Sequence, residues 1–149
     1  MSEQGNNTAI GGGGFHHVAM KANDFDATLA FYTEGLGFRR TYGWGSDDRP
    51  GGGVDSRAAL LDTGNGSYLE VFGGGKGADE PAPEGVVLHF ALRTSNADEA
   101  LERARAAGAV VTVEPKTVCV QGDRALDFRI AFVRGLNGEI IEFFQNDEL

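Results

Sequence analysis

Hydrophobic and polar residues follow one order in the first half of this chain. Residues 15–21 alternate as a strand does, and a helix is predicted from Asn23 or Asp24 to about Glu34. Further apolar segments predict strands at 37–43, 57–63 and 67–72, with a Gly/Asp-rich loop at 44–56. Asn65-Gly66 between the last two segments is a strong β-hairpin signal. The first half is therefore predicted to be a β-α-β-β-β unit.

The second half repeats this order. A strand at 86–93 precedes a helix from about 96 to 107, for which Asn96 and Glu99 form a capping pair. Three strands at 109–114, 117–121 and 126–134 follow, and Asn137-Gly138 turns the chain into a last strand at 139–145. The Gly- and Pro-rich stretch between the halves predicts a linker. The division is then a flexible arm at 1–14, modules at 15–73 and 86–146, and a linker at 74–85, in one globular domain.

A shift of 72 residues aligns the two halves without gaps. Segment 57–73 then falls on segment 129–145 with six identical residues, where about one would arise by chance. The same shift aligns His17 with His89 and Glu70 with Glu142. It also aligns Asp26 with Asp98. The chain is therefore predicted to be an internal duplication.

The two glutamates lie in strands whose residues are apolar on both faces, so we expect both faces to be covered. An ionised carboxylate in that setting is costly unless it is paired or bound to a metal. Arg57 and Arg129, each one hairpin strand away, are alternative partners, and a lone strand histidine is more often a satisfied core residue. The repeated pattern of two His and two Glu favours a metal site. His16 points to the opposite face and is interpreted as a surface residue or a supporting one.

Composition limits the partners of the chain. The sequence has 149 residues, 41% hydrophobic residues and a formal net charge of −9, which argues against nucleic-acid and membrane-surface binding. No apolar run approaches the roughly 20 residues of a membrane span, and the N-terminus does not resemble a secretory signal. The single Cys119 fits a reducing cytoplasm, and we expect it to be a buried structural thiol.

The segments FHHVAMKANDFDATLAFYTEGLGF, SYLEVFG, VVLHFAL and NGEIIEFF resemble the vicinal oxygen chelate superfamily. This superfamily includes glyoxalase I, bleomycin-resistance proteins and extradiol dioxygenases. The resemblance covers about residues 15–145 and implies an α+β fold, in which two paired β-α-β-β-β modules form curled mixed sheets around a shared cavity. It also implies metal ligands at His17, Glu70, His89 and Glu142, the ligand types of glyoxalase I.

The resemblance implies a divalent-metal-dependent enzyme that transfers a proton next to a carbonyl through an enediolate or enolate. Two imidazoles and two carboxylates suit Zn²⁺, Ni²⁺, Co²⁺ or Mn²⁺. Glu142, or Glu70 by the symmetry of the repeat, is the expected proton carrier. The substrate is expected to be an oxoaldehyde adduct or an acyl thioester, with Tyr42, Trp44, Lys116 and Arg124 as contact candidates by type, and the protein is expected to be a homodimer.

Two other classes stay open at this point. An Fe(II) extradiol-type dioxygenase uses two histidines and one carboxylate, and the fourth ligand here would crowd its oxygen site. A non-catalytic dimer that binds a drug or metabolite would need no metal.

Overall fold

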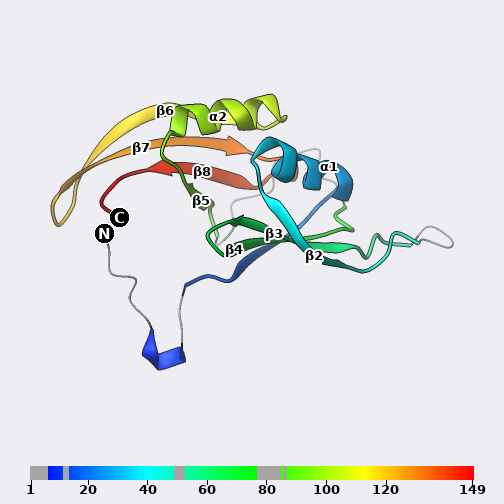
Figure 1. Ribbon diagram of the computed structural model, residues 1–149. Helices are drawn as coiled ribbons and strands as arrows, with labels where there is room; N and C mark the ends of the chain where they lie inside the picture. Colours follow the sequence, from blue (N-terminus) through cyan, green and yellow to red (C-terminus); the bar gives the residue numbers. More distant parts are fainter. Residues whose placement is uncertain (1–6, 12–13, 49–52, 77–84, 86) are drawn as a thin grey trace.

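Two four-stranded mixed sheets, one from each half of the chain, form the protein (Figure 1). The computed structural model describes residues 7–11, 14–48, 53–76, 85 and 87–149. The sheets have the equivalent strand orders β1-β4-β3-β2 and β5-β8-β7-β6. In each sheet the first strand runs parallel to the last, and the other pairs are antiparallel. The α+β class and the paired modules are thus confirmed.

The first module has strands β1 (His17–Lys21), β2 (Arg39–Trp44), β3 (Ala58–Gly64) and β4 (Ser67–Phe72), with helix α1 (Phe25–Ala30) between β1 and β2. The second has β5 (Phe90–Arg93), α2 (Ala97–Ala106), β6 (Val110–Gln121), β7 (Ala125–Arg134) and β8 (Ile140–Gln145). A π-helical turn, Phe31–Gly35, continues α1 over the predicted helix end, and a 3-10 turn, Thr8–Ile10, lies in the N-terminal arm. Most of the predicted linker lies outside the described residues.

Local signals set the ends of the elements. The side chains of Asp24 and Asn96 cap the two helices, because each accepts a hydrogen bond from the backbone N–H three residues on, at 2.9 and 3.1 Å. Asn65 and Gly66 both have positive φ, 62° and 76°, which is the type I′ turn that joins β3 tightly to β4. The predicted caps and the first hairpin are therefore confirmed.

One predicted break is wrong. Segments 109–114 and 117–121 form the single strand β6, which pairs with β7 through two shifts of register. The second shift, between Val113 and Lys116, brackets Pro115. β6 is an edge strand, with a neighbouring strand on one side only. Proline, which has no backbone N–H to donate, is tolerated in such a strand.

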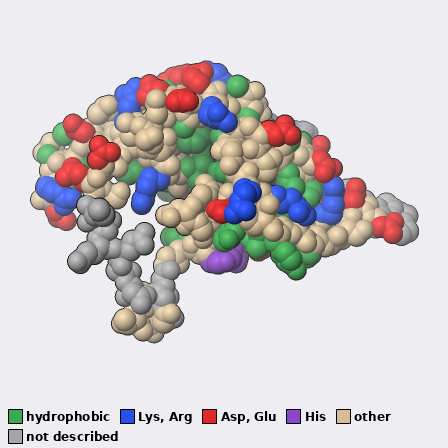
Figure 2. All heavy atoms as spheres, viewed as in Figure 1, with side chains coloured by type: hydrophobic (Ala, Val, Ile, Leu, Met, Phe, Trp, Pro, Cys, Tyr) green, Lys and Arg blue, Asp and Glu red, His purple; other side chains and the backbone are tan. Residues whose placement is uncertain are grey.

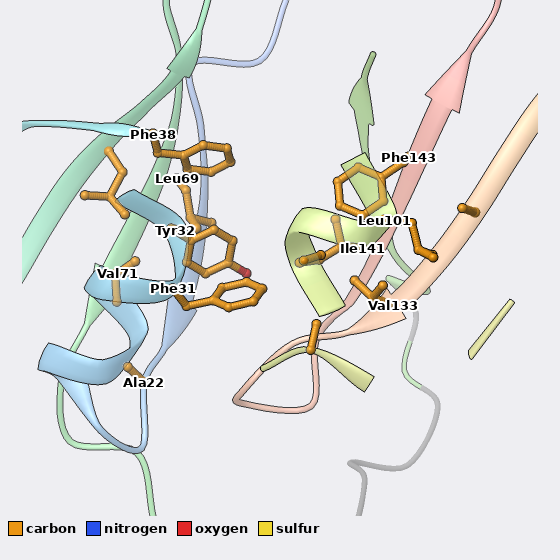
Figure 3. Close-up of a cluster of buried hydrophobic side chains, with 14 of the residues drawn as sticks. Ala22, Phe31, Tyr32, Phe38, Leu69, Val71, Leu101, Val133, Ile141 and Phe143 are labelled. Atoms are coloured by element: carbon orange, nitrogen blue, oxygen red, sulfur yellow. The ribbon is translucent and has the colours of Figure 1, made fainter. Parts of the chain in front are cut away.

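Within the described part of the chain, helices cover one face of each sheet and leave the other face open (Figure 1). Leu69 and Val71 of β4, and Ile141 and Phe143 of β8, are buried on the covered faces. Figure 3 shows these two groups of side chains facing each other across the module boundary, where they form one hydrophobic core. No helix in the described part of the chain is long and apolar enough to cross a membrane.

A buried polar joint fixes the two modules against each other. The hydroxyl of Tyr32, which is fully buried, donates a hydrogen bond to Glu139 Oε1 at 2.7 Å. Asn137 donates to Thr28 Oγ1 at 3.0 Å and accepts from the backbone N–H of Asn23 at 2.7 Å. Burial, followed by the charge of Glu139, raises the pKa of Tyr32 well above its ordinary value. Asn137-Gly138 thus has a second role, because it joins the modules as well as turning the chain.

The helices also meet at a position without a side chain. A Cβ placed on Gly35 would lie 2.6 Å from Cβ of Ala107, which is far inside van der Waals contact. Arg103 of α2 donates a hydrogen bond to the carbonyl of Gly35 at 3.3 Å. Glycine is therefore required here by close packing between the modules rather than by its backbone freedom.

Candidate metal site

The four predicted ligands come together as two pairs, one in each module. Nε2 of His17 lies 3.7 Å from Oε2 of Glu70, and Nε2 of His89 lies 2.9 Å from Oε2 of Glu142. His17 is at the start of β1, opposite Tyr68 of β4, and Glu70 is two residues further along β4. His89 directly precedes β5, which lies beside β8 and its Glu142. The parallel pairing of first and last strand therefore brings each His to its Glu.

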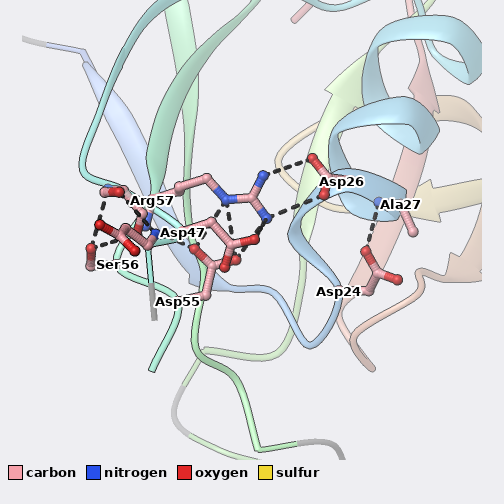
Figure 4. A network of polar contacts seen from close by, with 9 residues as sticks. Asp24, Asp26, Ala27, Asp47, Asp55, Ser56 and Arg57 are labelled. Carbon is pink, nitrogen blue, oxygen red and sulfur yellow. Dashed lines mark hydrogen bonds and ion pairs between the residues drawn. The ribbon is translucent and has the colours of Figure 1, made fainter. Parts of the chain in front are cut away.

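Arg57 and Arg129 do not partner these glutamates. Figure 4 shows the guanidinium of Arg57 between Asp26 and Asp55, with hydrogen bonds of 2.9 Å from Nη1 to Asp26 and 2.8 Å from Nη2 to Asp55. These hydrogen bonds raise the pKa of Arg57 above its already high ordinary value. Arg129 makes the equivalent bond to Asp98, at 2.6 Å from Nη2. The alternative of an arginine-paired glutamate is therefore wrong for both arginines.

The expectation that both strand faces are covered is also wrong for one chain. The face opposite the pairs is buried under the helices, whereas the face that carries them is only partly shielded. The side chains of Glu70 and Glu142 are exposed to 16% and 11%, and those of His17 and His89 to 42% and 37%. Figure 2 shows histidine side chains at the molecular surface next to hydrophobic ones. Each pair thus has a shielded carboxylate and an accessible imidazole.

The spacing of each pair suits a shared cation. Two N or O donors that bind one ion at about 2.0–2.2 Å lie roughly 3–3.5 Å apart, and the observed 2.9 and 3.7 Å fall close to this range. One imidazole and one carboxylate are common ligands of zinc and its neighbours in the first transition row. The residues present therefore fit a divalent metal in type and in spacing.

Two donors are too few for such a site. Catalytic zinc sites use three protein ligands. Among the described residues, no group of three or more His, Cys, Asp and Glu side chains is close enough to hold a metal ion. Each module of one chain therefore presents half of a possible site.

His16 contacts the first pair, as in the second of its two predicted roles, a surface residue or a supporting one. Its Nδ1 lies 2.9 Å from Nδ1 of His17, and its ring lies 5.0 Å from that of Tyr68, tilted by 31°. The backbone carbonyl of His16 accepts a hydrogen bond from the N–H of Tyr68 at 2.8 Å. The signal was the doublet His16-His17, because the second module has Leu88 where the first has His16.

The other singled-out residues lie in different places. Tyr42 and Trp44 contact each other, and Trp44 packs edge-on against Phe72, two residues beyond Glu70 on the same strand face. Lys116 of β6 lies opposite Ile130 of β7. Arg124 lies at the tip of the β6–β7 hairpin, with its Nε 4.0 Å from Oε1 of Glu148. Only the first two are thus placed beside a His–Glu pair by their strand register.

Cys119 is exposed, so the expectation of a buried thiol is wrong. It lies in the outer part of the β6–β7 hairpin, which extends beyond α2 (Figure 1). A hydrogen bond with Asp127 raises the pKa of its thiol. A raised pKa disfavours the thiolate, so the environment of Cys119 is unlike that of a catalytic cysteine.

Comparison with known proteins agrees with the geometry. The sequence profile of the Glyoxalase/Bleomycin resistance protein/Dioxygenase superfamily matches residues 14–143. The chain belongs to this superfamily. A sequence comparison with curated proteins gives no match. The matched segment includes both modules and all four predicted ligands.

Several solved structures share the fold at low sequence identity. TioX from Micromonospora sp. ML1 is 24% identical, with a TM-score of 0.59 over 91% of this chain and 100% of that one. TnmS3, an antibiotic binding protein from Streptomyces sp. CB03234, is 20% identical, with a TM-score of 0.61 over 91% and 97%. A glyoxalase I mutant from Zea mays is 22% identical, with a TM-score of 0.65, and this chain spans 45% of it. At these identities the likeness shows the fold alone.

Proposed function

We propose that this protein is a homodimeric, divalent-metal-dependent enzyme of the glyoxalase I type, which transfers a proton next to a carbonyl. The observation that carries the proposal is the repeated His–Glu pair, at His17 and Glu70 and again at His89 and Glu142. Membership of the superfamily supports the class of chemistry.

Each complete site would form between two subunits. His17 and Glu70 of one chain would face His89 and Glu142 of the partner subunit, which gives four ligands to a site. Two observations support this arrangement. One chain gathers only two ligands in each module among the described residues. The face that carries each pair is also open, so that a second sheet can cover it.

The edges of the sheets supply further support. β1, which carries His17, and β5, which follows His89, are edge strands, and no strand of the described residues pairs with their outer sides. Large apolar side chains around them are exposed, namely Phe15, Val18, Val87 and Leu88. Exposed apolar residues along an open strand edge are typical of an interface. A second copy of the chain would bury them.

A divalent cation held by these four side chains would supply a Lewis acid that polarises the substrate carbonyl. The chain's own contribution is the proton transfer. A glutamate, Glu142 or its repeat equivalent Glu70, would take the proton from the carbon next to the carbonyl and return it to the neighbouring carbon, or to the other face of the same carbon. Glu142 is the more shielded of the two, which favours proton exchange with the substrate over exchange with water.

Aromatic residues beside Glu70 would hold the apolar part of the substrate. Trp44 and Tyr42 are exposed; the ring of Trp44 contacts Phe72, and the ring of Tyr42 contacts Trp44. This group suits the hydrocarbon part of an oxoaldehyde adduct or an acyl thioester. It is the structural basis for choosing Tyr42 and Trp44 over Lys116 and Arg124 as substrate contacts.

The test combines metal analysis with a proton-exchange assay. The purified protein is loaded in turn with Zn²⁺, Ni²⁺, Co²⁺ and Mn²⁺, and hydrogen exchange and product formation from thiol adducts of 2-oxoaldehydes and from acyl thioesters are followed by NMR in D₂O. Glu142→Gln should lower turnover by about 10²–10⁴-fold. Glu114→Gln, on an exposed carboxylate paired with Arg105, is the matched control and should leave turnover unchanged.

Absence of metal binding by the intact protein, or equal turnover in both variants, would contradict the proposal. Iron-dependent oxygen consumption with a catechol would instead assign the protein to the dioxygenase branch.

A second candidate is a metal-free binding protein for an aromatic drug or metabolite. The exposed Trp44 and Tyr42 favour it, and TnmS3 is described as an antibiotic binding protein. Trp44 is the single tryptophan, so quenching of its fluorescence reports binding directly. Tight quenching by aromatic ligands in metal-free protein, with no turnover in the assay above, would favour this candidate.

A further inference from the structure

We propose that His16 is a positioning residue, which holds the imidazole of His17 in the tautomer that leaves Nε2 free to bind a metal. The inference rests on the proposed function for its purpose, but its geometry belongs to the metal-free protein. The distance of 2.9 Å between the two Nδ1 atoms means that one ring donates a proton and the other accepts it.

Metal binding requires His17 to be the donor, because a neutral imidazole that binds a metal through Nε2 carries its proton on Nδ1. Nε2 lies 3.7 Å from Glu70 Oε2, beyond hydrogen-bond distance, so no hydrogen bond between these two atoms has to be broken when a metal binds. A neutral His17 that donates from Nδ1 keeps the lone pair of Nε2 directed toward Glu70. His16 then accepts at Nδ1 and carries its own proton on Nε2. A metal-binding histidine usually donates its other ring N–H to a nearby acceptor, which fixes its tautomer and orientation. His16 would be that acceptor for His17.

His16 is itself held in place by two contacts with Tyr68. The rings pack at 5.0 Å, and the backbone N–H of Tyr68 donates to the carbonyl of His16 at 2.8 Å. Tyr68 also lies opposite His17 in the strand register. One residue of β4 thus orients the doublet, while Glu70 of the same strand supplies the second donor of the pair.

The second module lacks this arrangement. Leu88 occupies the position of His16 and has no acceptor, and the ring of His89 packs edge-on against Phe132 at 5.4 Å instead. The two modules therefore differ at this position, where only the first has an acceptor for a ring N–H.

Two substitutions separate hydrogen bonding from ring packing. His16→Phe keeps a ring against Tyr68 but has no acceptor, whereas His16→Asn keeps an acceptor oxygen and loses the ring. Long-range ¹H–¹⁵N spectra of metal-free protein, at a pH where the rings are neutral, identify the protonated nitrogen of His17. We expect the Nδ1–H form in the unsubstituted protein and in His16→Asn, and the Nε2–H form to dominate in His16→Phe. An Nε2–H form in the unsubstituted protein, or no change in His16→Phe, would overturn the inference.

Calorimetric titration with Zn²⁺ provides the second measurement. His16→Phe should weaken Zn²⁺ binding about 10-fold, within the range known for lost outer partners of metal ligands. His16→Asn should bind as the unsubstituted protein does. Equal weakening by His16→Phe and His16→Asn would refute a role of the acceptor. If the intact protein binds no Zn²⁺, the proposed function fails, while the tautomer measurement still decides the role of His16.

Discussion

Dimers with two different subunits test whether the metal site is completed across an interface. One subunit carries His17→Ala and Glu70→Gln, and the other carries His89→Ala and Glu142→Gln. If each site joins the first module of one subunit to the second module of its partner, this mixed dimer has one intact site and one without ligands. If each site lies within one chain, it has none.

The expected magnitudes follow from this count. Purified with two different tags, the mixed dimer should bind about half the Zn²⁺ of the unsubstituted dimer and show about half its turnover. Dimers of either variant alone should bind almost none. The side chains removed are accessible imidazoles, exposed to 42% and 37%, so their loss leaves no cavity in the core. Loss of metal can then be attributed to the missing ligands.

A second mixed dimer provides the reciprocal control. One subunit carries all four substitutions and the other carries none. Completion across the interface predicts no intact site in this dimer, and completion within a chain predicts one. Zn²⁺ content in the second dimer, and its absence from the first, would refute the proposed assembly. Full Zn²⁺ content in either doubly substituted homodimer would refute the four-residue site altogether.

Three further predictions concern the scaffold. Tyr32→Phe should lower the free energy of unfolding by about 1.5–3 kcal/mol, measured by denaturant titration, because it removes a buried hydrogen bond to Glu139. The pKa of Tyr32 is raised in the folded state. Its contribution to stability is therefore complete below its ordinary pKa of about 10 and is lost as the pH rises toward the raised value. Tyr32→Phe should lose less stability than the unsubstituted protein over that alkaline range, and parallel pH profiles of the two proteins would contradict this. Gly66→Ala should cost about 1 kcal/mol because φ is 76°, whereas Gly53→Ala, with open space around it, should be neutral, so equal effects would be evidence against the turn argument. Gly35→Ala should cost about 1–3 kcal/mol through contact with Ala107, and a melting temperature equal to that of the unsubstituted protein would show that the helices separate freely.

The sequence predicted the modules well because their signals are local. Alternation of apolar residues, the caps at Asp24 and Asn96, and the Asn65-Gly66 turn each act within a few residues. The errors arose where a distant segment decides the outcome. The edge position of β6 accommodates Pro115, and the reach of the β6–β7 hairpin past α2 exposes Cys119. Neither fact is visible in the pattern around those residues.

The candidate site was also predicted only in part from the sequence. The 72-residue register identified both His–Glu pairs, because parallel pairing of the first and last strand is a property of the repeated unit. It did not identify the partners of Arg57 and Arg129, although the same register aligns Asp26 with Asp98. In both ion pairs the Asp and the Arg lie 31 positions apart, so the two pairs are equivalent under the 72-residue repeat.

The differences between the two halves are as informative as the repeat. The duplication retains a His–Glu pair and an Asp–Arg pair in each module. Asn137 is identical to its counterpart Asn65 but makes a different contact, because it joins the modules. The sequence differs at His16, which has Leu88 as its counterpart. If His16 orients His17 as proposed, the two imidazoles are held by different partners. His17 contacts His16, whereas His89 contacts Glu142 at 2.9 Å and packs against the ring of Phe132. The two glutamates are unequal as well, because Glu70 lies 3.7 Å from its histidine, beyond hydrogen-bond distance, and Glu142 lies within that distance of its own.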